Sequence, residues 1–113
     1  MSAYVPDAGD IVWIDLSPQA GQETAFRHPA VVLTPAYYSV ATGLSLIVPM
    51  TTKAKGGTFE VPMRGARRAK GVVLANELRT VDYAARKTEK FDVCPADVLQ
   101  QVRDIGEALV RGE

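Results

Sequence analysis

The sequence of 113 residues is poor in residues that bind metals or form disulfides, since it contains one cysteine, Cys94, and one histidine, His28. A lone cysteine cannot close a disulfide within the chain, and the pair cannot supply the four Cys or His ligands of structural zinc. We therefore expect no metal and no other cofactor. Because no histidine lies near Cys94 in the sequence, we expect a packed thiol there rather than a nucleophile.

Long apolar segments are also absent. The longest uncharged stretch, residues 28–52, is interrupted by Pro29, Pro35, Gly43 and Pro49, which excludes a membrane-spanning helix. The N-terminus lacks the basic start and apolar centre of a signal peptide. We therefore expect a soluble, cytoplasmic protein without a membrane partner, and the length suits one domain over residues 1–113.

The chain has no net charge, because 13 Lys and Arg balance 13 Asp and Glu, but the charges are segregated. Residues 1–26 contain four acidic residues and no basic one, and residues 88–113 contain six acidic and three basic residues. Residues 53–87 contain nine basic residues against three acidic ones. The basic middle third suits a polyanionic partner, although the total charge would argue against one.

Most of the chain has the pattern of short β-strands. Five segments are predicted as strands, at residues 10–16, 30–33, 44–48, 58–63 and 71–75, and weaker patterns follow at 77–81 and 89–93. Pro49 is expected to end the third strand, and Pro62 places the fourth at a sheet edge. After Pro95 the apolar spacing becomes that of a helix, in which close packing is expected to hold Gly106. These elements predict a mainly β fold, as a small twisted barrel or two packed sheets with a C-terminal helix.

The polar loops carry residues suited to phosphate chemistry rather than a recognisable nucleotide-binding motif. RNA can be cleaved without a metal, because its 2′-OH attacks the adjacent phosphate when a base, an acid and phosphate-binding donors are present. Candidates for these tasks are Glu23, Arg27, His28, Thr51, Thr52, the Lys and Arg side chains of the loops, and Asn76-Glu77. The residues permit this chemistry without requiring it.

Several short motifs occur in a recognisable order. Tyr-Val-Pro-Asp-Ala-Gly-Asp at 4–10 leads into the strand of Trp13, and Gly-Gln-Glu at 21–23 precedes Pro-Ala-Val-Val-Leu at 29–33. Pro-Met-Thr-Thr at 49–52 leads into Lys55-Gly56 and Phe-Glu-Val at 59–61, and Gly-Val-Val-Leu-Ala at 71–75 precedes Arg79-Thr80. Over nearly its whole length the chain thus resembles the MazF/PemK family of bacterial toxin endoribonucleases.

The resemblance implies a small SH3-like barrel of about seven short strands with a C-terminal α-helix, acting as a homodimer. It implies sequence-specific, ribosome-independent cleavage of single-stranded mRNA without a metal, leaving 2′,3′-cyclic phosphate and 5′-OH ends. It also implies a cognate antitoxin that blocks the RNA groove with an extended, often acidic segment. A non-catalytic toxin that resembles CcdB and binds DNA gyrase is the alternative, because the same fold supports both.

The family resemblance places a catalytic Arg directly before the Pro of the second strand, and the first Thr after the Pro-x turn maps onto Thr51. In this chain His28 occupies the Arg position and Arg27 precedes it. His28 acts as acid or base, or a local bulge brings Arg27 into the site, or the enzyme is weak or inactive. These three readings remain open from the sequence.

Other site residues follow from the resemblance and from charge. Glu23 matches a family Glu and is a catalytic or substrate-orienting candidate, or a solvated carboxylate. Glu77 is either a base or an ion-pair partner of Arg79. Trp13 is expected in the core, and Tyr83 is a candidate for stacking on a base. The predicted RNA-binding residues are Thr52, Lys53, Lys55, Glu77, Arg79 and Arg86.

Overall fold

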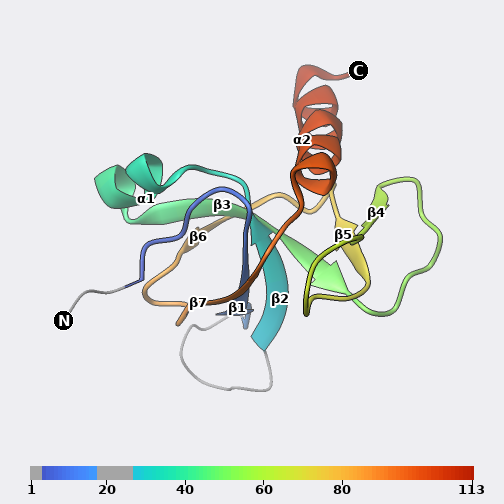
Figure 1. Cartoon of the computed structure of the whole chain (residues 1–113). Helices are drawn as coiled ribbons and strands as arrows, with labels where there is room; N and C mark the ends of the chain where they lie inside the picture. The colour runs from blue at the N-terminus through green and yellow to red at the C-terminus, as the bar shows by residue number, and fades with distance from the viewer. Residues whose placement is uncertain (1–3, 18–26) are drawn as a thin grey trace.

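The computed structural model describes residues 4–17 and 27–113, in which seven strands and two helices form (Figure 1). The strands are β1 (Asp10–Asp15), β2 (Arg27–Val32), β3 (Leu44–Thr51), β4 (Glu60–Pro62), β5 (Val72–Leu74), β6 (Arg79–Asp82) and β7 (Glu89–Val93). The helices are α1 (Ala36–Thr42) and α2 (Ala96–Arg111). Pairing is antiparallel in the order β4-β5-β3-β2-β1-β7, and β6 also pairs with β3. The predicted mainly β fold with a C-terminal helix is therefore confirmed.

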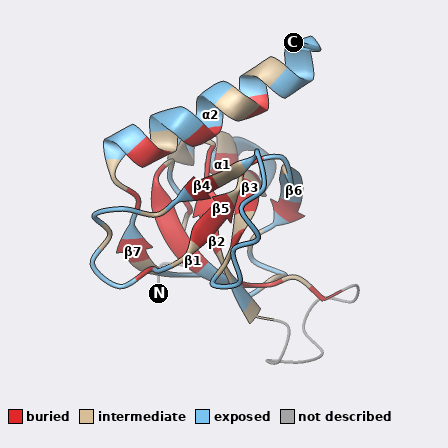
Figure 2. Cartoon of the chain, turned by 90° about the vertical axis from the view of Figure 1, so that its right-hand side faces the viewer, coloured by how far each residue is buried: buried red, intermediate tan, exposed pale blue. Residues whose placement is uncertain are grey.

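Both faces of the central strands are buried, as the two-sided apolar pattern of residues 10–16 predicts. On one face, Ile11, Val31 and Val48 pack with Val98 and Val102 of α2. The other face carries a second cluster formed by Val12, Ile14, Ala30, Val32, Ile47 and Val81. Figure 2 shows the buried strands beneath α2, whose outer face is exposed. Because successive side chains of a strand point to opposite faces, burial of both faces determines the face on which each side chain lies.

The third strand is longer than predicted, because Pro49 does not end it. β3 pairs with β2 as far as Pro49, opposite Ala30, and it pairs with β6 as far as Ile47 and with β5 at Met50 and Thr51. Proline is tolerated where the strand changes its partner, since the missing N–H interrupts neither ladder in its middle. This extension places Thr51 at the end of a strand instead of in a loop.

The short helix α1 is absent from the sequence prediction. Tyr37, Tyr38 and Val40 have modest helix propensity and give no long apolar stripe, so the pattern is too short to read. Two residues mark the ends of this helix in the sequence. Pro35 lies immediately before it, and Gly43, with φ 74°, lies immediately after it. The Gly43 N–H donates to the Ser39 carbonyl oxygen at 2.8 Å and closes the helix.

Three further expectations have definite outcomes. Pro62 lies in the edge strand β4, as predicted. Close packing does not require Gly106, because a Cβ there would meet Leu78 at 3.5 Å, an ordinary contact. Trp13 is not a core residue, since it is 38% exposed and stacks on Phe91. In the described part of the chain, no helix combines the length and apolar character needed to cross a membrane.

Candidate active site

A pocket of about 470 Å³ opens on the face of β3 that also carries Ile47, and we call it the His28 pocket. His28, Thr51, Glu77 and Arg79 line it together with apolar residues that include Leu16 and Leu74. β2 pairs with β3 in a register that aligns Ala30 with Pro49, and the same register extended by two residues aligns His28 with Thr51. The structure thus brings these two predicted site residues to one pocket.

The hydroxyl of Thr51 is oriented by the backbone. Its Oγ1 accepts a hydrogen bond from the Lys53 N–H at 3.0 Å, which leaves the O–H free to donate. Gly71 permits the adjacent strand to approach, because it has φ +101° and a Cβ there would lie 2.2 Å from the Thr51 carbonyl oxygen. Thr51 therefore presents a hydroxyl donor from a rigid strand end, an arrangement suited to a phosphate oxygen.

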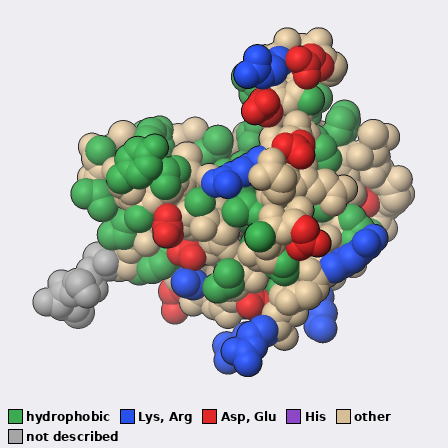
Figure 3. Space-filling model, turned by 45° about the horizontal axis from the view of Figure 1, so that its top comes forward, with side chains coloured by type: hydrophobic (Ala, Val, Ile, Leu, Met, Phe, Trp, Pro, Cys, Tyr) green, Lys and Arg blue, Asp and Glu red, His purple; other side chains and the backbone are tan. Residues whose placement is uncertain are grey.

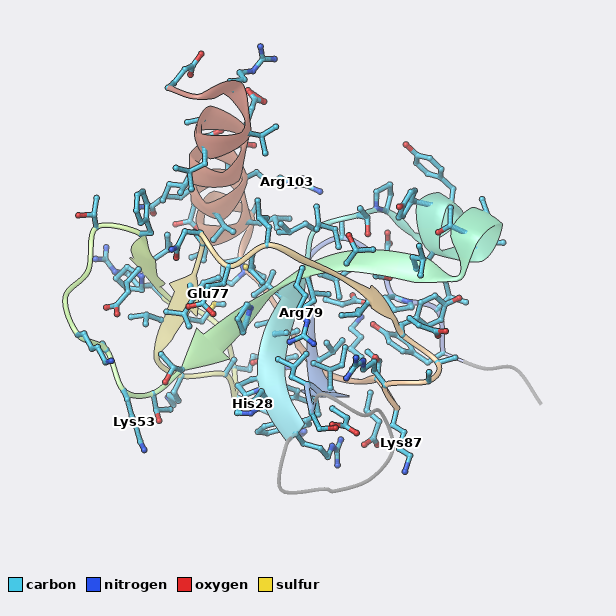
Figure 4. The ribbon with its side chains drawn as sticks, turned by 180° about the vertical axis from the view of Figure 1, so that it is seen from behind. His28, Lys53, Glu77, Arg79, Lys87 and Arg103 are labelled. Atoms are coloured by element: carbon cyan, nitrogen blue, oxygen red, sulfur yellow. The ribbon has the colours of Figure 1, made fainter. Side chains whose placement is uncertain are left out.

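Glu77 and Arg79 both reach the His28 pocket without forming the ion pair that was one expectation. The Glu77 N–H donates to the Leu74 carbonyl oxygen at 3.0 Å, closing a tight turn after β5, and Arg79 begins β6 opposite Ile47. No ion pair within 4.0 Å involves either side chain in residues 4–17 and 27–113. Figure 4 shows His28, Glu77 and Arg79 on the same side of the molecule, and both charges remain available to a ligand.

A second pocket of about 450 Å³ adjoins the first and shares Thr51, Leu74 and Glu77 with it; we call it the Lys55 pocket. Lys53 and Lys55 line it, as does Glu60 of β4. Figure 4 shows Lys53 projecting outward from the loop between β3 and β4. The two pockets adjoin at Thr51 and Glu77, with His28 and Arg79 on one side and the two lysines on the other.

Glu60 anchors the lysine loop. Its carboxylate accepts hydrogen bonds from the Lys55 N–H at 3.1 Å and from the Gly56 N–H at 2.9 Å. Gly56 has φ +75°, so the two N–H groups converge on one anion as in other backbone nests. In the sequence Glu60 is recognisable only as part of the Phe-Glu-Val motif; its position four residues after Gly56 is the signal that could have identified it.

Arg27 lies on the opposite face of β2 from His28. It forms an ion pair with Glu89 of β7, and its guanidinium carbon lies 6.0 Å from the centre of the Trp13 ring. The register between β1 and β2 runs without a shift from Ile11 to Asp15, so no bulge turns Arg27 toward the His28 pocket. Of the two candidate residues before Pro29, only His28 lines that pocket.

The remaining predicted residues are distributed differently. Arg86 donates to the carbonyl oxygens of Asp15, at 3.4 Å, and Ser17, so it supports the end of β1 and lines neither pocket. Thr52 is exposed and also lies outside the lining of both pockets. The Tyr83 hydroxyl donates to the Ser39 carbonyl oxygen at 3.3 Å. Glu23 lies outside the described residues.

Asp92, which sequence analysis did not select, organises the basic loop before β5. Burial of its carboxylate would raise the pKa, but hydrogen bonds from the backbone N–H groups of Ala69, Arg68, Val93 and Arg67 stabilise the charged form and lower the pKa below its ordinary value. An aspartate near the end of a strand, as Asp92 is in β7, carries no local sequence signal that it binds the backbone of a distant loop.

Cys94 is buried, as expected for a packed thiol. Burial, followed by the negative charges of Asp97 and Asp92, raises the pKa of Cys94 to about 11, which keeps it in the unreactive thiol form. Among the residues that the structure describes, no group of three His, Cys, Asp or Glu side chains is arranged to hold a metal ion.

Comparison with known proteins gives a consistent family. Residues 7–105 match the family described as PemK-like, MazF-like toxin of type II toxin-antitoxin system. The chain is 44% identical over 99 residues to the endoribonuclease toxin MazF of Escherichia coli K12, covering 87% of this chain and 88% of that protein. It is 31% identical over 100 residues to the endoribonuclease PemK of Escherichia coli, covering 85% and 75% of the two chains.

Solved structures agree with this result. The crystal structure of MazF from Deinococcus radiodurans has a TM-score of 0.86 and 45% identity, with 96% of this chain and 98% of that chain covered. A crystal structure of MazE-MazF from the same organism has a TM-score of 0.84 and 42% identity, with 96% and 97% covered. These relatives disfavour the gyrase-binding alternative and confirm the resemblance noted in the sequence. The chain belongs to the PemK-like, MazF-like toxins of type II toxin-antitoxin systems.

Proposed function

We propose that this protein is an endoribonuclease toxin that cleaves single-stranded mRNA at a specific sequence, without a ribosome or a metal, in the His28 pocket. The observation that carries the proposal is the shared pocket of His28, Thr51, Glu77 and Arg79. In this pocket His28 and Glu77 are able to transfer protons, and Thr51 and Arg79 are able to donate hydrogen bonds to a phosphate. The adjoining Lys55 pocket supplies positive charge for the RNA backbone.

The proposed reaction uses the RNA's own 2′-OH as nucleophile. The carboxylate of Glu77 takes the 2′-OH proton while the 2′-oxygen bonds to phosphorus. Thr51 and Arg79 donate hydrogen bonds to the phosphorane oxygens, and protonated His28 gives its proton to the 5′-oxygen as the P–O5′ bond breaks. The products are a 2′,3′-cyclic phosphate and a 5′-OH. Glu23, which lies outside the described residues, stays a predicted catalytic or substrate-orienting residue.

The test is cleavage of a mixed-sequence RNA by the purified protein in EDTA, with the 5′-OH ends detected by phosphorylation with a kinase. We expect His28→Ala to lower kcat by about 100- to 10,000-fold, the usual worth of a proton-transfer group. Thr51→Ala should lower kcat by about 100-fold, through loss of one phosphorane donor. Uncut RNA with the wild-type protein would overturn the proposed function.

Arg27→Ala is the matched control, because it removes the neighbouring cation from the other face of β2. We expect it to keep kcat within about threefold of wild type, since no transition-state contact is lost. If His28→Ala cuts as fast as wild type while Arg27→Ala does not, the roles of the two residues are reversed.

We also propose a cognate antitoxin, a homodimer, one domain over the whole chain and a cytoplasmic location. The MazE-MazF structure of a 42% identical relative supports the antitoxin. An apolar pocket of about 490 Å³ beside α2, lined by Leu46, Leu78 and the 79% exposed Val110, supports burial against a second copy. Light scattering at micromolar concentration tests the dimer. Rescue of growth by the open reading frame that adjoins the gene tests the antitoxin.

A further inference from the structure

A third pocket, which none of the proposed catalytic residues lines, lies between the basic loop of residues 64–70 and strand β7. It has a volume of about 410 Å³ and is lined by Arg67, Arg68, Lys90, Phe91, Asp92 and Val93. We call it the Phe91 pocket. Three of its six lining residues are basic, and Figure 3 shows basic side chains projecting at the edge of the molecule away from α2.

The acidic residue in this pocket does not neutralise the arginines. Asp92 is 8% exposed, and its Oδ2 accepts hydrogen bonds from the backbone N–H groups of Arg68 and Ala69 at 2.6 and 2.7 Å. Its Oδ1 accepts from the Val93 N–H at 2.8 Å. The carboxylate is therefore committed to the loop backbone, which it holds in place while the arginine side chains remain exposed.

No other counter-charge reaches the two arginines. Within the described ranges, neither Arg67 nor Arg68 forms an ion pair within 4.0 Å. Glu89, the other acidic residue of β7, is already paired with Arg27, and Lys90 is paired with Asp10 at 3.2 Å. Two exposed guanidinium groups on a fixed backbone, without acidic partners, are suited to a phosphate, whose oxygens accept paired hydrogen bonds from the planar guanidinium.

An aromatic platform adjoins the arginines. Phe91 lines the pocket and stacks on Trp13, with ring centres 4.7 Å apart and an angle of 20° between the rings. Trp13 remains 38% exposed, although it lies in the central strand β1 beside fully buried residues, and the guanidinium carbon of Arg27 lies 6.0 Å from its ring centre. A stacked aromatic pair beside unpaired arginines is the combination that proteins use to hold an unpaired base and its phosphate.

We propose that the Phe91 pocket is an accessory RNA-binding site, which holds nucleotides that flank the cleaved bond. Arg67 and Arg68 bind the RNA backbone, and a base stacks against the Trp13–Phe91 pair. This inference rests on the proposed function for its substrate. Trp13 directly precedes Ile14 in β1. Ile14 pairs with His28, so the side chain of Trp13 faces the other side of the sheet. The accessory site therefore lies on the other side of the β1–β2 ladder from the His28 pocket.

The platform favours RNA over an acidic peptide as the occupant. Arginines alone would attract either polyanion, but the partly exposed Trp13–Phe91 pair gains most from the π-face of a nucleobase. Binding of an acidic antitoxin segment by Arg67 and Arg68, with no effect on RNA, is accordingly an outcome that would overturn the proposal.

The experiment compares two RNAs that share one cleavage site mapped with the wild-type protein. One has about 25 nucleotides and extends past both pockets, and the other has about seven and fills the His28 pocket alone. The test variant is the double substitution Arg67→Ala/Arg68→Ala. The matched control is Arg64→Ala/Lys70→Ala, which removes the same charge from the same exposed loop at residues outside the Phe91 pocket.

We expect the test variant to raise KM for the long RNA by about tenfold and to reduce the slope of log affinity against log salt by about one unit, as loss of one or two phosphate contacts requires. The KM for the short RNA and kcat for both should stay within about twofold of wild type, because the reacting groups are untouched. The control variant should change KM for the long RNA by less than about threefold.

The only tryptophan of the chain gives an independent readout. The long RNA, with its cleaved nucleotide replaced by a 2′-deoxynucleotide, should quench Trp13 fluorescence, and the short RNA should not. Equal losses in the two double variants, or equal effects on the two RNAs, would show a general charge effect and overturn the accessory site. If the wild-type protein cleaves neither RNA, the proposed function fails instead, so the two failures are distinguishable.

Discussion

Arg27 forms an ion pair with Glu89 across strand β1, on the face of the sheet opposite the His28 pocket. Adjacent residues of a strand point to opposite faces, so the same backbone that presents His28 to the pocket directs Arg27 away from it. The order of these two residues in the sequence therefore decides which of them faces the proposed substrate.

Glu89→Gln should leave kcat for RNA cleavage unchanged, because it removes a charge partner on the face away from the His28 pocket. The ion pair is partly exposed, at 33% for Arg27 and 69% for Glu89, so its loss should lower the free energy of unfolding by less than about 1 kcal/mol. Cleavage rates and urea unfolding curves check both expectations. A large loss of kcat would show that Arg27 reaches the reacting phosphate.

Glu60→Ala should weaken RNA binding more than it slows chemistry. It removes the acceptor of the Lys55 and Gly56 N–H groups, so the lysine loop loses its fixed conformation. We expect KM to rise by about five- to tenfold with kcat within about twofold, because the loss affects ground and transition states alike. Glu113→Ala, at an exposed position after α2, is the control and should change neither parameter.

Gly71→Ala and Gly106→Ala should have opposite effects on stability. At Gly71 the added Cβ would lie 2.2 Å from the Thr51 carbonyl oxygen at φ +101°, so unfolding should become easier by about 3 kcal/mol or more. At Gly106 the contact with Leu78 is 3.5 Å, and replacing glycine in a helix should stabilise the protein by about 0.5–1 kcal/mol. Thermal unfolding measures both. Tolerance of Gly71→Ala would contradict the described approach of β5 to Thr51.

The Asp92 carboxylate should make the protein sensitive to acid. Its pKa is lower in the folded protein than in the unfolded chain, so its contribution to stability is complete above the unfolded pKa of about 4. That contribution is lost as the pH falls through the lower folded value. Asp92→Asn should cost about 1–3 kcal/mol at pH 7 and flatten stability against pH below about 4.

Asp104→Asn is the control for acid sensitivity, because Asp104 lies exposed on α2. It should leave both the stability at pH 7 and its acid dependence close to wild type. Urea unfolding between about pH 2.5 and pH 7 separates the two variants. An acid dependence of Asp92→Asn equal to that of wild type would assign the effect to another carboxylate.

The mainly β fold could be predicted from local patterns, because strands buried on both faces and a helix with one apolar stripe leave signatures within a few residues. Strand ends were less predictable. Pro49 is a strong local signal for an end, but pairing with β5 at Met50 and Thr51, after the pairing with β6 ends at Ile47, keeps the strand intact through Thr51. Such a change depends on residues distant in the sequence.

The sequence by itself determined the family, the candidate residues His28 and Thr51, and the alternation that separates His28 from Arg27. The tertiary structure decided which candidates meet. The register between β2 and β3, extended by two residues beyond Ala30 and Pro49, aligns His28 with Thr51. Pairing of β6 with β3 brings Arg79 to the same pocket, and Arg86 instead holds the end of β1. The physical reason is that strand alternation is a local property, whereas register, partner exchange and counter-charges arise from contacts between distant segments.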